Sequence, residues 1–326
     1  MHLAGLTEQA LMESGVRKAH ARALVAWFAG RAARPRAADA YETELPRSEA
    51  VHDPDGTVRF AVHLDGRTVV ETVLIEHATR RTVCVSSQAG CARGCVFCET
   101  GRLGLVRNLT AAEIVSQYAI VARHLGERPR NVVFMGMGEP LDNLEEVLKA
   151  IDVLREPAGF AVPERHITVS TVGIVPKMTE LYARTKAQVA VSLHALEPAT
   201  RKALLPVARK WPLEQLRAAI ASAPRTVLLQ WTLIDGVNDS QTDADALARF
   251  CGGLDVRVNL IPLNPGPVPE QRAPPLDRCR AFQKWLADAG VRTLLRMPHG
   301  QQVGGACGQL AGQKRRQRAD STAALP

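Results

Sequence analysis

The sequence predicts an α/β fold: a partial (β/α), TIM-like barrel with a small N-terminal helical and hairpin extension. Beyond residue 81, short β-branched runs alternate with longer helical segments, which indicates a parallel sheet covered by helices. The 326 residues suit one large α/β domain with an appendage better than several small domains. Small polar residues follow several of the strands, and chemistry gathers at the carboxyl ends of such strands.

The first 80 residues predict the extension. Residues 1–45 are expected to form a short helical accessory segment that ends in the linker-like stretch GRAARPRAADA. Residues 46–80 are expected to form a β-hairpin extension, because two β-rich runs in TVRFAVHLDGRTVVETVLIE flank Asp65-Gly66, a strong signal for a two-residue turn. This hairpin places Glu71 on its second strand.

Residues 81–312 are expected to form the barrel. Its clearest helix begins at Thr110, where Thr110 and Glu113 are spaced as a capping box. Residues 313–326 form a basic tail with little to bury, which we expect to be disordered. The strands are expected at residues 82–86, 131–135, 166–171, 188–193, 226–232, 257–261 and 291–296.

Composition and charge narrow the class of protein. The net charge of +8 is compatible with a polyanionic partner, although charge alone favours a solvated basic surface and tail as its explanation. No stretch approaches the roughly 20 uninterrupted apolar residues of a membrane span, and the N-terminus lacks the features of a signal peptide. We therefore expect a cytoplasmic protein with no membrane partner. The odd count of 7 cysteines argues against a disulfide framework and for metal or redox chemistry.

Three cysteines carry the strongest motif. Cys91, Cys95 and Cys98 form C-x3-C-x2-C on a glycine-containing loop after the first barrel strand. Three thiolates can bind three irons of a 4Fe-4S cluster and leave the fourth iron open for S-adenosylmethionine, as in radical S-adenosylmethionine (radical SAM) enzymes. A zinc knuckle would need a fourth ligand, and no cysteine follows until Cys251. A thioredoxin-like pair needs two thiols and does not explain Cys91.

Polar residues at successive strand ends form a candidate site for S-adenosylmethionine. Each residue taken alone is an ordinary capping or turn residue. Together, after consecutive strands and downstream of the three cysteines, they predict a cofactor cradle. The candidates are Gly138, Glu139, Ser170, Ser192, Leu193, His194 and Asn264.

Segments from about residue 67 to 313 closely resemble the RlmN/Cfr family of radical SAM RNA adenine methyltransferases. They are, in order, CVSSQAGC, RNLTAAEI, VFMGMGEPLDN, TVSTVGIVPK, VSLHA, DGVNDS, NLIPLNP and ACGQLAG. The resemblance implies a barrel of the radical SAM type, a 4Fe-4S cluster and S-adenosylmethionine as cofactors, and rRNA or tRNA as the substrate. It also implies an electron donor such as flavodoxin or ferredoxin.

The same resemblance implies three catalytic residues. Cys307 stands where the family carries a methylated cysteine, Cys84 at the position of its disulfide partner, and Glu71 at that of the base. In the implied reaction, the methyl group on Cys307 becomes a radical and adds to adenine, at C2 or alternatively C8. Glu71 then removes the ring proton, and Cys84 releases the product through a transient disulfide. Cys251 and Cys279 match no motif and are expected to be structural.

The chain departs from the family pattern in three places, of which the first two lie in regions expected to contact RNA. RMPHGQQVGG precedes ACGQL where the family usually has acidic residues and a second arginine, the N-terminal region is shorter, and Glu99 replaces a serine. Two other functions stay open at this stage. One is a radical SAM enzyme of another reaction type, for which Cys84 and Cys307 would have no use. The other is a non-catalytic metal- or RNA-binding protein.

Overall fold

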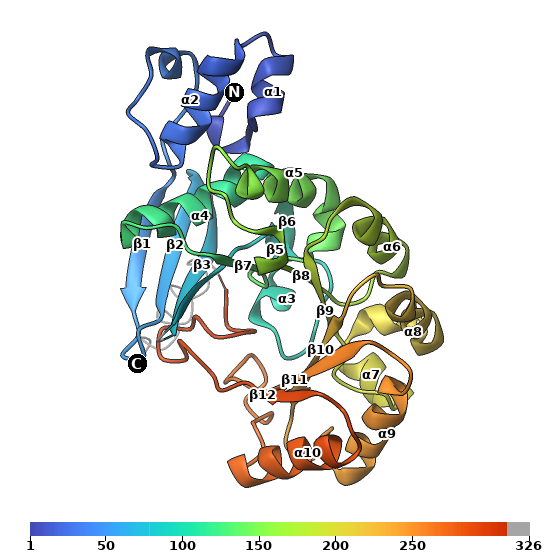
Figure 1. Cartoon of the computed structure of the whole chain (residues 1–326). Coiled ribbons are helices and arrows are strands. Elements are labelled where there is room, and N and C mark those ends of the chain that lie inside the picture. Colours follow the sequence, from blue (N-terminus) through green and yellow to red (C-terminus); the bar gives the residue numbers. More distant parts are fainter. Residues whose placement is uncertain (78, 312–326) are drawn as a thin grey trace, which may run out of the picture.

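The computed structural model describes residues 1–77 and 79–311 (Figure 1). Within them, one sheet of ten strands has the order β1-β2-β3-β4-β7-β8-β9-β10-β11-β12. The first pairs are antiparallel, and from β4 onward every pair is parallel. The antiparallel strands are β1 (Arg47–His52), β2 (Val58–Asp65) and β3 (Thr68–His77), which joins β4 (Arg80–Cys84).

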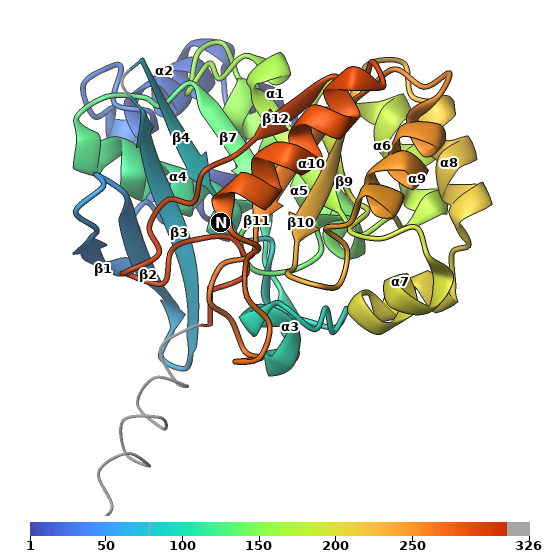
Figure 2. The ribbon, with the colours of Figure 1, turned by 90° about the horizontal axis from the view of Figure 1, so that it is seen from below.

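The parallel strands form the predicted partial barrel. They are β4, β7 (Asn131–Phe134), β8 (Ile167–Thr171), β9 (Gln188–Ser192), β10 (Val227–Leu233), β11 (Val256–Pro262) and β12 (Thr293–Leu295). Helices cover the outer face of this sheet, as the view from below shows (Figure 2). They are α4 (Ala111–Leu125), α5 (Leu144–Arg155), α6 (Val175–Arg184), α8 (Leu213–Ala221), α9 (Gln241–Cys251) and α10 (Leu276–Asp288). The α/β fold class is confirmed.

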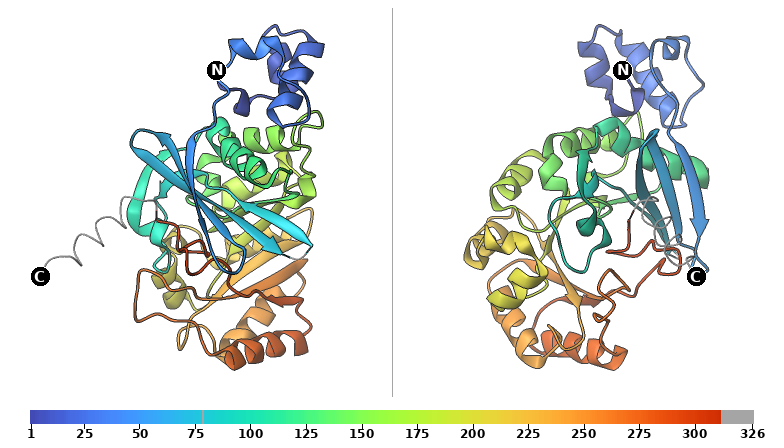
Figure 3. Two further views of the ribbon diagram at one scale, coloured as in Figure 1. Left: turned by 90° about the vertical axis from the view of Figure 1, so that its left-hand side faces the viewer. Right: turned by 180° about the vertical axis from the view of Figure 1, so that it is seen from behind.

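The first 45 residues form two short helices and two 3₁₀ turns. These are η1 (Leu3–Gly5), α1 (Glu8–Glu13), α2 (Lys18–Phe28) and η2 (Arg36–Ala40). This segment lies against the outside of the barrel near α4 and α5 (Figures 1 and 3). Phe28 packs edge-on against Phe160 at 6.1 Å between ring centroids, and a Cβ on Gly5 would lie 3.2 Å from Ala112 Cβ. These contacts bury the apolar side of helices that are too short to be stable alone.

The hairpin β2–β3 forms, with two differences from the prediction. The turn is centred one residue later, because the Asp65 carboxylate accepts hydrogen bonds from the Arg67 and Thr68 amides at 3.1 and 2.7 Å and so stands before the turn. An extra strand, β1, pairs with β2. It was missed because it is an edge strand, mostly exposed, without the alternation of apolar and polar residues that predicts a strand.

After β12 the chain leaves the barrel and crosses its open side to reach the hairpin (Figure 2). The Arg59 guanidinium donates to the Val303 carbonyl at 2.6 Å, and the Gly300 amide donates to Asp55 at 2.8 Å. The tail predicted for 313–326 lies outside the described residues. Within the described part of the chain, no helix has the length and apolar character needed to cross a membrane.

Candidate active site

The three-cysteine segment extends from a small hairpin inside the barrel mouth. The expected loop contains a strand, β5 (Gln88–Cys91), so that Cys91 ends a strand, while Cys98 precedes α3 (Glu99–Leu103). β5 pairs with β6 (Gly104–Asn108). The pairing requires glycine at position 90, since its φ is +76° and an added Cβ would lie 1.9 Å from the Gly104 carbonyl oxygen. So short a strand, with glycine inside it, carries no periodic signal in the sequence.

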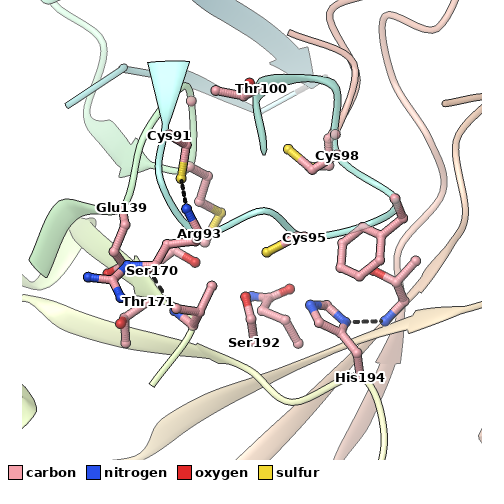
Figure 4. Close-up of a pocket in the computed structure, with 18 of the residues that line it drawn as sticks. Cys91, Arg93, Cys95, Cys98, Thr100, Glu139, Ser170, Thr171, Ser192 and His194 are labelled. Atoms are coloured by element: carbon pink, nitrogen blue, oxygen red, sulfur yellow. Dashed lines mark hydrogen bonds between the residues drawn. The ribbon is translucent and has the colours of Figure 1, made fainter. Parts of the chain in front are cut away.

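All three thiols line one cavity at the carboxyl ends of the parallel strands (Figure 4). The residues predicted as the cofactor cradle line the same cavity with one exception. The exception is Leu193, whose side chain is fully buried in the core, because neighbouring residues of an extended segment point to opposite faces; its role in binding the cofactor stays a prediction. The structure brings together Gly138, Glu139, Ser170, Ser192, His194 and Asn264.

Glu139 is held rigidly at the cavity wall. Its carboxylate accepts hydrogen bonds from the Leu141 and Val172 amides at 3.0 and 2.9 Å. Burial nevertheless raises the pKa of Glu139 to about 7. A positive charge beside this buried carboxylate favours its ionised form. Glu139 is therefore well suited to bind the ammonium group of a ligand.

His194 is a neutral imidazole on the other side of the cavity. It has a φ of +55°, and its Nδ1 accepts a hydrogen bond from the Thr232 amide at 2.9 Å. Burial lowers the pKa of His194 to about 3. The accepted bond leaves the proton on Nε2, so that this nitrogen can donate to a ligand.

Sequence reasoning missed several residues of the cavity wall. Gln230, on β10, is 4% exposed and neither amide atom has a hydrogen-bond partner in the described residues, so it is available to a polar ligand. Arg93 fixes the cysteine segment by donating through Nε to Asp142 at 2.6 Å. Gln230 could have been found as a polar residue inside an otherwise apolar strand. Arg93 carries no comparable signal.

Cys307 lines this cavity and also a second, adjoining one. Cys84, the last residue of β4, is in the wall of the second cavity. The Cys307 loop is fixed by its carbonyl, which accepts from Asn264 Nδ2 at 3.0 Å, and by the Gly308 carbonyl, which accepts from the Glu99 amide at 2.7 Å. Burial, reinforced by the charge of the nearby Cys307, raises the pKa of Cys84 to about 12. All seven cysteines are free thiols in this structure.

Glu71 lies outside the walls of both cavities. Its carboxylate forms an ion pair with Arg59, and both side chains are about 5% exposed. It also accepts a hydrogen bond from the Ala311 amide at 2.7 Å. Glu71 therefore contacts the segment that carries Cys307, but from beneath it. Cys251 and Cys279 are buried in α9 and α10, away from both cavities.

The thiol set fits a cluster better than a single ion. No group of three or more Cys, His, Asp or Glu side chains in the described residues is close enough together to hold one metal ion. Thiolates that bind separate irons of a cluster stand farther apart than the ligands of one ion. Burial raises the pKa of Cys91 to about 12 and also that of Cys95 and Cys98, a cost that coordination of a cation would offset.

A parallel partial barrel with three thiols at its mouth defines a radical SAM enzyme, a class that uses a 4Fe-4S cluster and S-adenosylmethionine. Residues 85–248 match the radical SAM superfamily. A crystal structure of a radical SAM methyltransferase from Sphaerobacter thermophilus superposes with a TM-score of 0.88 and 36% identity, covering 96% of this chain and 100% of that chain.

Similar sequences define the family more narrowly. The dual-specificity RNA methyltransferase RlmN of Syntrophobacter fumaroxidans is 47% identical over 262 residues, which are 78% of this chain and 77% of the relative. RlmN of Geotalea uraniireducens is 44% identical over 270 residues, 81% of this chain and 78% of the relative. The chain belongs to the RlmN family of radical SAM RNA methyltransferases.

Proposed function

We propose that this enzyme methylates a ring carbon of adenine in rRNA or tRNA, C2 or alternatively C8, with Cys307 carrying the methyl group. The position of Cys307 between two cavities supports the proposal most directly. One cavity contains the thiols that would hold the cluster, and the other contains Cys84. A cysteine placed in this way can exchange a group between a cofactor on one side and a nucleobase on the other.

In this proposal the first cavity holds the cofactors. Cys91, Cys95 and Cys98 bind three irons, and Glu139 binds the ammonium group of S-adenosylmethionine. Ser170, Ser192, His194 and Asn264 line the remainder of the cradle together with Gly138. When bound, the cluster and S-adenosylmethionine supply a methyl group and a carbon radical that abstracts hydrogen.

Cys307 and Cys84 then act in sequence. The thiolate of Cys307 accepts a methyl group, and after this methyl has lost a hydrogen atom its carbon bonds to the adenine ring. The odd electron that this addition leaves on the ring would return to the bound cluster when the ring proton is removed. Cys84 attacks the Cys307 sulfur, so that the new S–S bond forms while the S–C bond breaks and its electron pair leaves with the carbon, which takes up a proton and becomes the product methyl group. Burial disfavours the Cys84 thiolate, so its proton must be removed at the time of attack.

Removal of the ring proton is assigned to Glu71. Because Arg59 holds the Glu71 carboxylate beneath the C-terminal segment, that segment must shift before Glu71 can reach a base.

The proposal also includes a low-potential electron donor such as flavodoxin or ferredoxin. It places the reaction in the cytoplasm, where RNA is found and where free thiols persist.

A Cys84→Ser variant tests the proposal. With the cluster reconstituted under anaerobic conditions, and with S-adenosylmethionine, a reductant and rRNA or tRNA transcripts, the variant is expected to form a covalent protein–RNA adduct, visible as a shifted band. Cys251→Ser is the matched control, because Cys251 is buried away from both cavities, and it should turn over normally. Mass spectrometry of digested RNA identifies the methylated carbon and nucleotide. Normal turnover by Cys84→Ser would contradict the proposed release step.

A further inference from the structure

Arg201 is a buried cation without a carboxylate partner. It lies in α7 (Pro198–Leu204) and is 2% exposed. Its guanidinium donates a hydrogen bond to the Leu193 carbonyl, and its Nε has no partner among the described residues. No Asp or Glu in that part of the chain forms an ion pair with it. Since an unpaired buried charge costs several kcal/mol, the position calls for a negative charge nearby.

The negative group is on the cysteine segment. The Val96 amide donates to the Leu204 carbonyl at 3.1 Å, so the end of α7 is joined to the residue that follows Cys95. Arg201 is three residues before Leu204 and shares its face of the helix. A negative charge on Cys95, as on a thiolate bound to a cluster, would favour the protonated guanidinium. Burial lowers the pKa of Arg201 only to about 10, so the side chain is a cation at neutral pH.

We propose that Arg201 is a positioning residue for electron transfer, whose fixed charge behind Cys95 balances the cluster and raises its reduction potential. A 4Fe-4S cluster with three thiolates carries a net negative charge, and reduction makes it one unit more negative. A cation in a buried, weakly polarisable position stabilises the reduced form more than the oxidised form. Arg201 is absent from the wall of the cofactor cavity, so this effect needs no contact with S-adenosylmethionine.

The test measures the midpoint potential of the reconstituted holoenzyme, without RNA or S-adenosylmethionine, by redox titration followed by electron paramagnetic resonance. Arg201→Met and Arg201→Gln remove the charge, and Arg201→Lys retains it. Lys202→Met is the matched control, because Lys202 is the next residue of α7 and is exposed, so that solvent screens its charge.

At the wild-type midpoint, the ratio of reduced to oxidised cluster should fall about tenfold or more in the two neutral variants. For a one-electron couple this is a shift of about 59 mV to lower potential. Arg201→Lys should stay within about twofold of the wild-type ratio, and Lys202→Met should not change it. Unchanged midpoints in neutral variants with wild-type iron and sulfide content would overturn the proposal.

If the neutral variants lose the cluster, Arg201→Lys distinguishes the two causes, which are the missing charge and disturbed packing. A wild-type iron content in the lysine variant would support a requirement for positive charge at this position. A lysine variant that also fails to hold the cluster would assign Arg201 to packing and overturn the proposal. Neither measurement depends on methyl transfer, so the outcome is separate from that of the proposed RNA methylation.

Discussion

Arg59 and Glu71 form a buried ion pair between β2 and β3, directly beneath the segment that carries Cys307. Arg59 holds that segment as well, since its Nε donates to the Val303 carbonyl at 2.6 Å. The pair therefore links the N-terminal hairpin to the end of the barrel chain. A residue implied as the catalytic base is at the same time part of the structure that positions Cys307, the cysteine proposed to carry the methyl group.

Glu71→Gln should destabilise the protein as well as impair methylation. The substitution leaves the Arg59 charge buried without a partner, and we expect the free energy of unfolding in urea to fall by about 3–5 kcal/mol. Adding Arg59→Met should recover part of this loss, because no unpaired charge then remains. Asp288→Asn, in the exposed pair with Lys284, is the control and should have little effect on stability. If the losses in the free energy of unfolding caused by Glu71→Gln and Arg59→Met simply add in the double variant, the two side chains are not coupled.

Gly138→Ala should cost more stability than a substitution at a comparable glycine. Gly138 has a φ of +101°, and an added Cβ would lie 2.6 Å from Gln88 Cβ. Gly253 has a φ of +74° but nothing within 4 Å of an added Cβ. We expect Gly138→Ala to unfold about 1–3 kcal/mol more easily than Gly253→Ala, and to bind S-adenosylmethionine more weakly in equilibrium dialysis. Equal stabilities would contradict this prediction, because they would require the backbone at Gln88 to yield to the added Cβ at no cost.

His194 should make the cluster-free protein sensitive to acid. Its pKa is about 3 in the folded chain and near 6.5 in the unfolded chain, so between these values only the unfolded chain binds the proton. This contribution is fully present above pH 6.5 and is lost as the pH falls toward 3. Relative to His194→Gln, the wild type should lose about 1.4 kcal/mol more per pH unit between pH 6 and 4 in urea unfolding. If the free energy of unfolding fell equally with pH in the wild type and in His194→Gln, His194 would not be buried as a neutral ring.

The barrel could be predicted because its signals are local. Strands such as β8 and β10 are short β-branched runs, and α4 begins at a capping box that the structure contains at Thr110 and Glu113. β1 and β5 could not be predicted, since one is an exposed edge strand and the other contains a glycine required by its neighbour. Their formation depends on pairing partners rather than on their own residues.

The candidate site, like the fold, could be predicted from the sequence only in part. The spacing of Cys91, Cys95 and Cys98 specifies a three-thiol segment, and the alternation of strands and helices brings the strand ends to one side of the sheet. The sequence alone does not decide which of two neighbouring residues faces the cavity, and the structure directs the Leu193 side chain into the core. Arg201 gave no signal at all, because a basic residue in a short helix is usually exposed.

By itself the sequence determined the chemistry that this chain can perform: three cysteines on a short segment, two further thiols and a series of polar strand ends in an α/β barrel. Only the tertiary structure decided that Cys84 and Cys307 share a cavity, that Arg59 holds Glu71 beneath the Cys307 segment, and that Arg201 is buried behind Cys95. The physical reason is that spacing and periodicity act over a few neighbouring residues. Burial and charge pairing, in contrast, depend on segments that only the closed fold brings together.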